Sequence, residues 1–417
     1  MTQGIDLTGI SWVRLSFVDV FGVSHSMQLP AERFAAAVAR GEPFDGSSLE
    51  GRARLLEVDM RLRPDPETLV HLGYGLARAV CTVLTNDGTP WLSDPRTALA
   101  MVIKDTGELG RNYTAAAELE FYLLNASGTP IDGDGYFEET DSVGMKVVRD
   151  AADRLASYGI AIDSSHHEAG PGQYEIDLAH LSPMRLADAL VLAKHVVREA
   201  AAGAGLRATF MPRPFAGEAG SGLHLHQRIG SQLVRDDDVL NEEGRFFLAG
   251  QLSHARGLSA LASPTVNSYK RLHSGPEAPS AAVWAHLNRG ALVRLSPNMM
   301  GGATIEFRGS DPSANPYLLL AGLLAAGAHG LELSIELPPA LEEDIGIFDP
   351  AASDSARFEP LPRDLDDALD ALLADDVLVD AFDQQLLSQL VDGRRAEAAA
   401  YRMQVTPWEL DRYLNEA

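Results

Sequence analysis

Four segments of this chain alternate apolar side chains with acids or histidines at every second position. In AELEFYLL, Glu118 and Glu120 alternate with leucine and phenylalanine, and GQYEID, GLHLHQ and IEFRG repeat the pattern. Because successive side chains of a strand point to opposite faces, each segment predicts a strand with one apolar and one polar face. Any one could be an ordinary solvated strand, but alternate acids repel unless a cation lies between them. Four such strands therefore predict an acid-lined cavity.

These polar faces, together with Glu168, carry the donor atoms of a site for hard cations. Oxygen and nitrogen ligands would come from six residues: Glu118, Glu120, Glu168, Glu175, Glu306 and His224. The set suits Mg²⁺ or Mn²⁺, suits zinc poorly without a thiolate, and suffices for two ions that keep some water. Four arginines lie later in the chain: Arg271, Arg289, Arg294 and Arg308. Hard cations beside arginines indicate phosphoryl transfer from a metal-bound nucleotide.

Composition narrows the class of protein. A length of 417 residues with 46% hydrophobic and 22% charged residues is ordinary for two or three globular domains. The formal net charge of -25 argues against a general nucleic-acid or anionic-membrane surface. The single cysteine, Cys81, excludes an intramolecular disulfide framework and is predicted to pack in a strand. No signal peptide is predicted, and the apolar segment from Tyr317 predicts a buried helix, so we expect a soluble, cytoplasmic protein.

The order of predicted elements gives an α+β fold with two domains. Residues 1–93 predict a small, mainly β domain with a hairpin at 10–29 and a short helix at 31–41. Asp94 as N-cap and Pro95 then open a helix, so the second domain is placed at 94–417. Its predicted strands are 114–124, 172–178, 206–211, 221–229 and 303–309. Its predicted helices are 141–158, 184–204, 244–262 and 314–334, with an irregular segment at 335–362 and amphipathic helices at the end.

Nine segments, in order and spread over nearly the whole sequence, resemble the bacterial type I glutamine synthetase family. They are FDGSSLEG, AELEFYLL, SSHHEAGPGQYEID, ATFMPRP, GSGLHLHQ, NSYKRLHSGPEAP, NRGALVRL, IEFRGSDPSANPYL and VTPWEL. One match would be weak, but the ordered set is highly specific. The resemblance implies a β-grasp domain at 1–93 and an ATP-guanido kinase-like catalytic domain at 94–417, built on a curved antiparallel sheet flanked by helices. It also implies a dodecamer of two stacked hexameric rings, with each active site between neighbours.

The resemblance implies two metal sites. One ion would be held by Glu120, Glu168 and Glu175. A second ion would be held by Glu118, His224 and Glu306. The AGPGQ turn, which by itself could be a solvated loop, a phosphate cradle or half of a metal site, would then bring two ligands of one ion together. His226 and Arg294 would face ATP.

The resemblance also implies how the other substrates are bound. Arg271 would hold the α-carboxylate of glutamate, with Gly220 close to the substrate. Arg289 and Arg308 would stabilise the transferring phosphoryl group and the γ-carboxylate. The ammonium pocket and its flap would be formed by Asp45, Ser48, Tyr136 and Glu277. Asp45, with Ser48, would reach into the neighbouring subunit's site and take a proton from ammonium, and Glu277 would lie on the flap that closes over the acyl phosphate.

The activity that the resemblance implies is an ATP-dependent ligation of ammonia to the γ-carboxylate of L-glutamate through γ-glutamyl phosphate. Two Mg²⁺ or Mn²⁺ ions per site would be cofactors and ATP a co-substrate. The alternative is a γ-glutamyl ligase for an organic amine such as a polyamine, ethanolamine or an alkylamine. A third reading, an inactive structural family member, conflicts with the presence of all six metal ligands. Departures from the family pattern bear on the choice of acceptor and nucleotide: Arg52, Ala219, Arg228 and Thr304.

Overall fold

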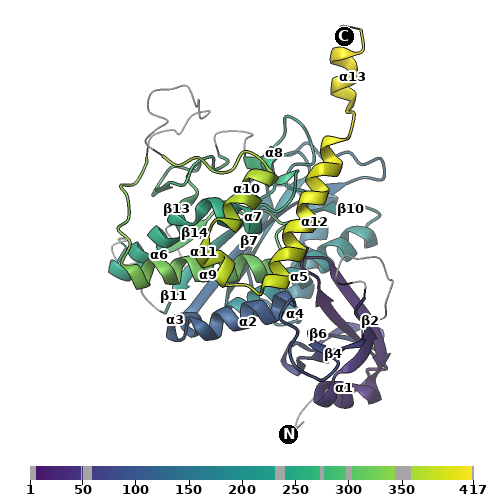
Figure 1. Cartoon of the computed structure of the whole chain (residues 1–417). Helices are drawn as coiled ribbons and strands as arrows, with labels where there is room; N and C mark the ends of the chain where they lie inside the picture. The colour runs from purple at the N-terminus through teal and green to yellow at the C-terminus, as the bar shows by residue number, and fades with distance from the viewer. Residues whose placement is uncertain are drawn as a thin grey trace.

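The first of two β-sheets belongs to the N-terminal part of the chain, drawn in purple in Figure 1. The computed structural model describes residues 6–47, 49, 59–230, 240–272, 277–296, 303–342 and 358–415. The first sheet has the order β2-β1-β6-β4-β3, with β5 also paired to β6. Its strands are β1 (Trp12–Val18), β2 (Ser24–Pro30), β3 (Glu42–Asp45), β4 (Asp59–Pro64), β5 (Val70–Gly73) and β6 (Leu76–Thr85). The β1–β2 pair is antiparallel and confirms the predicted hairpin, whereas β1 and β6 run parallel.

The core of this small domain lies between the sheet and helix α1 (Phe34–Arg40). Alternate residues of β1 and β6 are buried in it, including Leu15 and Cys81, which confirms the packing role predicted for the cysteine. Strands β3 and β5 were not predicted from the sequence. Each has only four residues, too few to show a period-two pattern, and each forms by pairing with a longer neighbour.

The second sheet has eight strands in the order β12-β13-β14-β11-β7-β9-β8, with β10 also paired to β7. Its strands are β7 (Tyr113–Leu124), β8 (Ile162–His167), β9 (Gln173–Leu181), β10 (Arg207–Thr209), β11 (Leu223–Ile229), β12 (Trp284–Ala285), β13 (Val293–Ser296) and β14 (Thr304–Phe307). All pairs are antiparallel except β12 with β13, so the predicted antiparallel sheet carries one parallel edge pair. Strands β8, β12 and β13 were not predicted.

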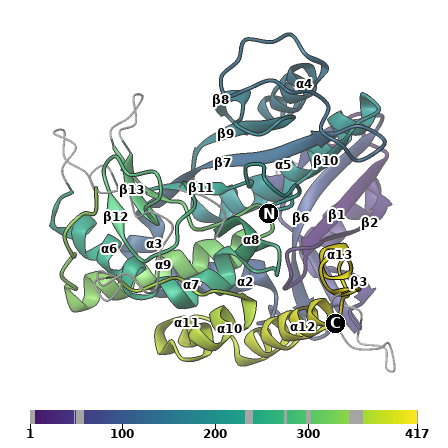
Figure 2. The same ribbon diagram turned by 90° about the horizontal axis from the view of Figure 1, so that it is seen from above.

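The second domain has helices that mostly cover the apolar face of its sheet and the domain boundary, except for the C-terminal helix, which extends away from the body (Figures 1 and 2). They are α2 (Pro95–Asp105), α3 (Glu108–Asn112), α4 (Val143–Ser157), α5 (Pro183–Gly203), α6 (Glu242–Ser253), α7 (Ala255–Ala262), α8 (Ser268–Leu272), α9 (Pro316–Leu333), α10 (Leu365–Leu373), α11 (Asp376–Asp380), α12 (Gln384–Arg402) and α13 (Pro407–Tyr413). Asp94 caps α2 by accepting a hydrogen bond from the Thr97 amide, as predicted. The single helix predicted at 244–262 is wrong, because His254 leaves the helical conformation and separates α6 from α7.

Helix α9 is the apolar segment that the sequence predicted to be buried. Among the described residues it is long and apolar enough to cross a membrane, but 67% of it is buried within the protein. It packs against α2, α5, α6 and α7. Leu119, Phe121 and Leu123, on the apolar face of β7, join the same core. This arrangement confirms a core helix and leaves the opposite face of the sheet to the polar side chains.

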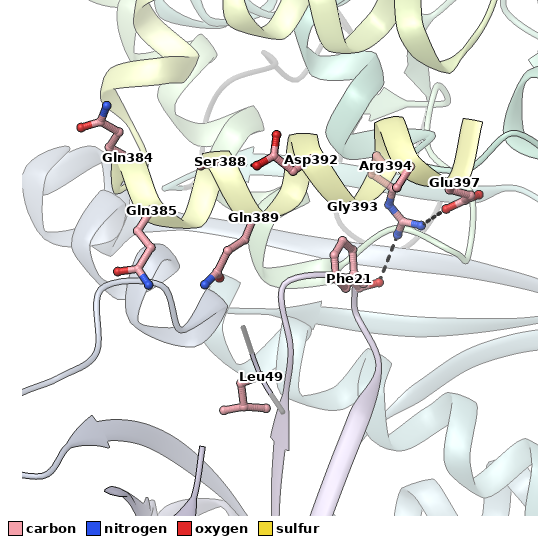
Figure 3. A pocket seen from close by; sticks show the side chains of 11 residues that line it. Phe21, Leu49, Gln384, Gln385, Ser388, Gln389, Asp392, Gly393, Arg394 and Glu397 are labelled. Carbon is pink, nitrogen blue, oxygen red and sulfur yellow. Dashed lines mark hydrogen bonds and ion pairs between the residues drawn. The ribbon is translucent and has the colours of Figure 1, made fainter. Parts of the chain in front are cut away.

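The tip of the β1–β2 hairpin fastens the small domain to the rest of the chain. The guanidinium of Arg394, on α12, lies 5.2 Å from the ring centroid of Phe21 and donates to the carbonyl oxygen of Phe21 (3.3 Å), as Figure 3 shows. Asn315, the N-cap of α9, donates to the Asp19 carbonyl (3.0 Å). A cavity of about 890 Å³ adjoins these contacts and is lined mainly by α12. Among the described residues, no predicted site residue lines it.

Candidate active site

Strand register aligns the polar side chains of the second sheet into rows. Glu118 on β7 is directly opposite His224 on β11 and Asp177 on β9. Two residues further along β7, Glu120 is opposite Glu175 on β9. Side chains opposite each other on neighbouring strands lie about 5 Å apart at Cβ. The register therefore concentrates acids from strands that are far apart in the sequence.

Glu118, His224 and Glu306 form the first cluster, whose donor atoms all lie within 4.8 Å of one another. His224 Nδ1 is 2.6 Å from Glu118 Oε2 and 3.9 Å from Glu306 Oε1. Glu306 is fully buried and accepts hydrogen bonds from Arg294 Nε (2.7 Å) and Arg308 Nη1 (2.5 Å). The structure thus brings together the three residues predicted for one ion and places two of the predicted arginines beside them.

His166, Glu168 and Glu175 form a second cluster with donor atoms within 4.8 Å of one another. His166 Nε2 is 3.1 Å from Glu175 Oε1, and its Nδ1 is 3.5 Å from Glu168 Oε1. The resemblance implies Glu120 as the third residue beside Glu168 and Glu175, whereas in the structure the third member of this cluster is His166. Glu120 lies alongside, with Oε2 accepting from the Gly222 amide (2.8 Å) and from Gln173 Nε2 (3.1 Å). Its role as a ligand stays a prediction.

Burial makes the charges in these clusters costly. Burial, and then repulsion from Glu120, raises the pKa of Glu168 to about 8. Burial, and then repulsion from Glu118, raises the pKa of Glu175 well above its usual range. Burial also opposes the charge of Glu118, but hydrogen bonds from His224 and His226 outweigh it and hold its pKa well below the ordinary value. A divalent cation would relieve this repulsion, and carboxylate and imidazole donors suit one.

Metal-free protein should lose stability as the pH rises through the pKa of Glu168. A carboxyl whose pKa is raised from 4.5 to about 8 stabilises the fold fully below its unfolded pKa, and this contribution is lost as the pH rises through about 8. We expect chelator-treated protein to melt at a lower temperature at about pH 8.5 than at about pH 6, and Mn²⁺ to reduce the difference. Glu168→Gln should flatten the pH dependence measured by calorimetry. An unchanged slope in that variant would contradict the assignment.

The backbone of the GSG segment comes close to the buried Arg271. Arg271 donates to the carbonyl oxygens of Ser310 (3.0 Å) and Arg308 (3.1 Å). A Cβ atom on Gly220 would lie 2.7 Å from Arg271 Cγ, and one on Gly222 would lie 2.6 Å from His224 Nε2. Both glycines are therefore needed for this close approach. Ala219, a departure from the family pattern, accepts a hydrogen bond at its carbonyl from the Tyr122 hydroxyl (2.7 Å), so its backbone is held without a special side chain.

His226 links the first cluster to Thr304, another residue that departs from the family pattern. Its Nε2 lies 2.8 Å from Glu118 Oε1, and its Nδ1 lies 2.8 Å from the hydroxyl oxygen of Thr304. Thr304 is fully buried. The threonine thus fixes the ring of His226 from the side away from the cluster. Two residues lie outside the described part of the chain: Ser48, a predicted site residue, and Arg52, which departs from the family pattern.

Tyr136, Glu277 and Arg289 meet at the exposed rim of the second cluster. The Arg289 guanidinium lies 5.9 Å from the Tyr136 ring centroid, and its Nη1 is 3.9 Å from Glu277 Oε1. The Tyr136 ring packs edge-on against His166, with centroids 5.8 Å apart. Sequence reasoning missed His166, although its place two residues before Glu168 was a usable signal. Asp45, by contrast, is exposed on β3 of the first sheet, away from the strands that carry the clusters.

These features define a two-domain α+β enzyme whose sheet carries carboxylate and histidine clusters beside arginines. The glutamine synthetase β-grasp domain family matches residues 9–86, and the glutamine synthetase catalytic domain family matches residues 92–413. The chain belongs to the glutamine synthetase family.

Relatives with this architecture cover nearly the whole chain. It is 36% identical to a glutamine synthetase of Halobacterium salinarum, over 99% of this chain and 95% of that protein. It is 37% identical to one of Thermotoga maritima, over 98% of both. A solved structure of apo GmaS is 29% identical and superposes with a TM-score of 0.87 over 100% of both chains. A Plasmodium falciparum glutamine synthetase is 20% identical with a TM-score of 0.86, over 97% of this chain and 96% of that one, and supports the fold alone.

Proposed function

We propose that this protein joins ammonia to the γ-carboxylate of L-glutamate at the expense of ATP, through γ-glutamyl phosphate. The family and the identity of 36–37% with curated glutamine synthetases over 98–99% of the chain support a glutamate–ammonia ligase. The observation that carries the proposal is the pair of partly buried clusters beside β7, the strand that carries Glu118 and Glu120, with Arg294 and Arg308 bonded to Glu306. A binding module or inactive relative has no need to hold so many mutually repelling carboxylates.

The two clusters fit divalent cations, which we propose to be two Mg²⁺ or Mn²⁺ ions. Glu118, His224 and Glu306 would hold one, and Glu120, Glu168 and Glu175 the other. Bound there, the ions would neutralise charge on the phosphoryl group of ATP during transfer. The donor set supports hard cations because it is mainly carboxylate oxygen and holds no thiolate.

The protein's own side chains have three tasks in this reaction. A carboxylate is a poor electrophile, so it must first become an acyl phosphate, and Arg308 and Arg289 would stabilise the transferring charge. Arg271, which is buried beside Gly220, would hold the α-carboxylate of glutamate. Glu277 lies at the exposed rim and would close over the acyl phosphate to exclude water.

Deprotonation of ammonium needs a base, and the proposed base, Asp45, points to a homo-oligomer. Asp45 lies on the first sheet, so it would serve the site of a neighbouring chain in an assembly that the resemblance makes a dodecamer. Helix α13 extends from the body of the molecule (Figure 1) and exposes large apolar side chains, among them Trp408 (64%), Leu410 (46%) and Tyr413 (50%). Such a surface on a projecting helix is suited to contact with another copy. We propose a cytoplasmic location.

Ammonium should be the preferred acceptor. Tyr136 and Glu277 meet Arg289 at the rim. Ser48 would complete the pocket, and a pocket closed around ammonium should leave no room for an alkyl chain. One misplaced methylene is worth roughly 1–3 kcal/mol, or about 10–200-fold in specificity. We expect kcat/KM for ammonium to exceed that for methylamine and ethanolamine by at least about tenfold. The measurement is phosphate release with identification of the γ-glutamyl product. An alkylamine that equals ammonium would replace this function with a γ-glutamyl amine ligase, and no phosphate release with any acceptor would indicate an inactive relative.

A further inference from the structure

Asp132 lies behind the turn that joins the two acids of the second cluster. Its Oδ1 accepts a hydrogen bond from the Gly172 amide (2.8 Å) and lies 3.0 Å from His167 Nε2. Its Oδ2 accepts a hydrogen bond from the Tyr174 hydroxyl. The side chain of His167 is fully buried, and that of Asp132 is 12% exposed. One carboxylate therefore contacts strand β8, strand β9 and the turn between them.

Two of the three partners of Asp132 directly precede an acid of the second cluster in the chain. His167 precedes Glu168, and its Nδ1 donates to the Glu168 carbonyl oxygen (2.7 Å). A carbonyl oxygen only accepts, so this bond fixes the backbone at Glu168. Tyr174 precedes Glu175 on β9. Asp132 thus holds the residue before each acid, and both acids depend on the same anchor for their separation.

The turn itself has little freedom to compensate for losing that anchor. Gly172 has a φ of +68°, and a Cβ atom on it would lie 3.0 Å from the Leu123 carbonyl oxygen and 3.2 Å from Pro130 Cβ. The Gly172 carbonyl also accepts from the Leu123 amide (2.8 Å). The turn is therefore held against β7 on one side and by Asp132 on the other. Removing one of these supports would let the two acids move apart.

A cation site of its own is the competing explanation for this cluster. Donor atoms of Asp132, Asp134 and His167 lie within 4.8 Å of one another. However, both oxygens of Asp132 already accept hydrogen bonds, from the Gly172 amide and the Tyr174 hydroxyl. Each of these bonds takes up a lone pair of Asp132 and brings a positive hydrogen atom next to its carboxylate. The contacts favour an anchor over a ligand.

We propose that Asp132 is a positioning residue that holds Glu168 and Glu175 at the separation needed to bind a divalent cation, an inference that rests on the proposed function of the second cluster. Partners that orient metal ligands without touching the metal are worth about 10–100-fold in metal affinity. Asp132→Asn keeps the size of the side chain but replaces one carboxylate oxygen with an N–H₂ group, which cannot accept from the Gly172 amide or the Tyr174 hydroxyl. We expect it to weaken Mn²⁺ binding within that range while the apolar core stays intact.

The test is calorimetric titration of Mn²⁺ into metal-stripped full-length protein, with thermal unfolding measured in chelator. Asp134→Asn is the matched control, because it removes the same charge from the same loop and should change the Mn²⁺ affinity less than about threefold. Tyr174→Phe removes one bond to Asp132 and keeps the ring, so it should weaken binding less than Asp132→Asn does. Activity at saturating Mn²⁺ should recover in Asp132→Asn, which separates positioning from a general loss of structure.

Each other outcome has a distinct meaning. Equal losses in Asp132→Asn and Asp134→Asn would overturn the proposal in favour of a third cation site. A lower unfolding temperature with unchanged Mn²⁺ affinity in both Asp132→Asn and Tyr174→Phe would reduce Asp132 to a structural role. Glu175→Ala serves as the positive control. If that variant also binds Mn²⁺ normally, the assignment of the second cluster fails, and with it the proposed function of the site rather than the anchor alone.

Discussion

Replacing Glu175 with alanine should abolish ATP-dependent amide formation and leave the fold intact. Glu175 is buried on β9 opposite Glu120, and its Oε1 is 3.1 Å from His166 Nε2. Burial and neighbouring acids raise its pKa well above the usual range, so its loss relieves repulsion and leaves the apolar core unchanged. We expect activity below about 1% of the parent, a loss beyond the roughly 10–100-fold caused by removing a partner that only orients a metal ligand. The thermal midpoint of metal-free protein should not fall.

Glu332→Ala is the matched control for this variant. Glu332 is an exposed glutamate in the last turns of α9, so the same substitution there should leave activity and metal dependence unchanged. Both variants are assayed for phosphate release over a range of Mg²⁺ concentrations. Retained activity in Glu175→Ala with the parent's Mg²⁺ dependence would remove Glu175 from the metal site.

Two inactive variants should restore activity when they share one oligomer. Asp45→Ala removes the proposed base on the small domain, and Glu175→Ala removes a ligand on the second sheet. If each site uses a small domain from a neighbouring chain, some interfaces of a mixed oligomer pair an intact Asp45 with an intact Glu175. Random equimolar mixing would make about one site in four complete. We expect activity to rise from near zero to a comparable fraction of the parent.

The experiment uses co-expressed chains with different affinity tags, purified through both tags so that only mixed oligomers are assayed. The control pairs Glu168→Ala with Glu175→Ala, two lesions in the same cluster, and should show no recovery because no site has both acids. If the Asp45 pairing also fails to recover in a verified mixed oligomer, Asp45 does not act on a neighbour's site.

The local sequence pattern was sufficient to predict the long strands and helices. Strand β7 was predicted within one residue because its alternation of apolar and acidic side chains persists over AELEFYLL. Helix α5 was predicted equally well from its long Ala- and Leu-rich run. Strand β8 was missed because IDSSHH is mostly polar and shows no alternation, and it forms only by pairing with β9. The break at His254 was missed because its side-chain partner, Asp375, is 121 residues away.

The sequence by itself determined which side chains share a strand face, because the period of two is a property of each strand alone. It could not determine which strands are neighbours or in what register, and the site depends on both. His224 meets Glu118 across 106 residues. Similarly, Asp132 reaches Tyr174 across 42 residues. A shift of one residue in register would turn His224 or His166 to the opposite face, so only the packed sheet could decide that His166 joins Glu168 and Glu175.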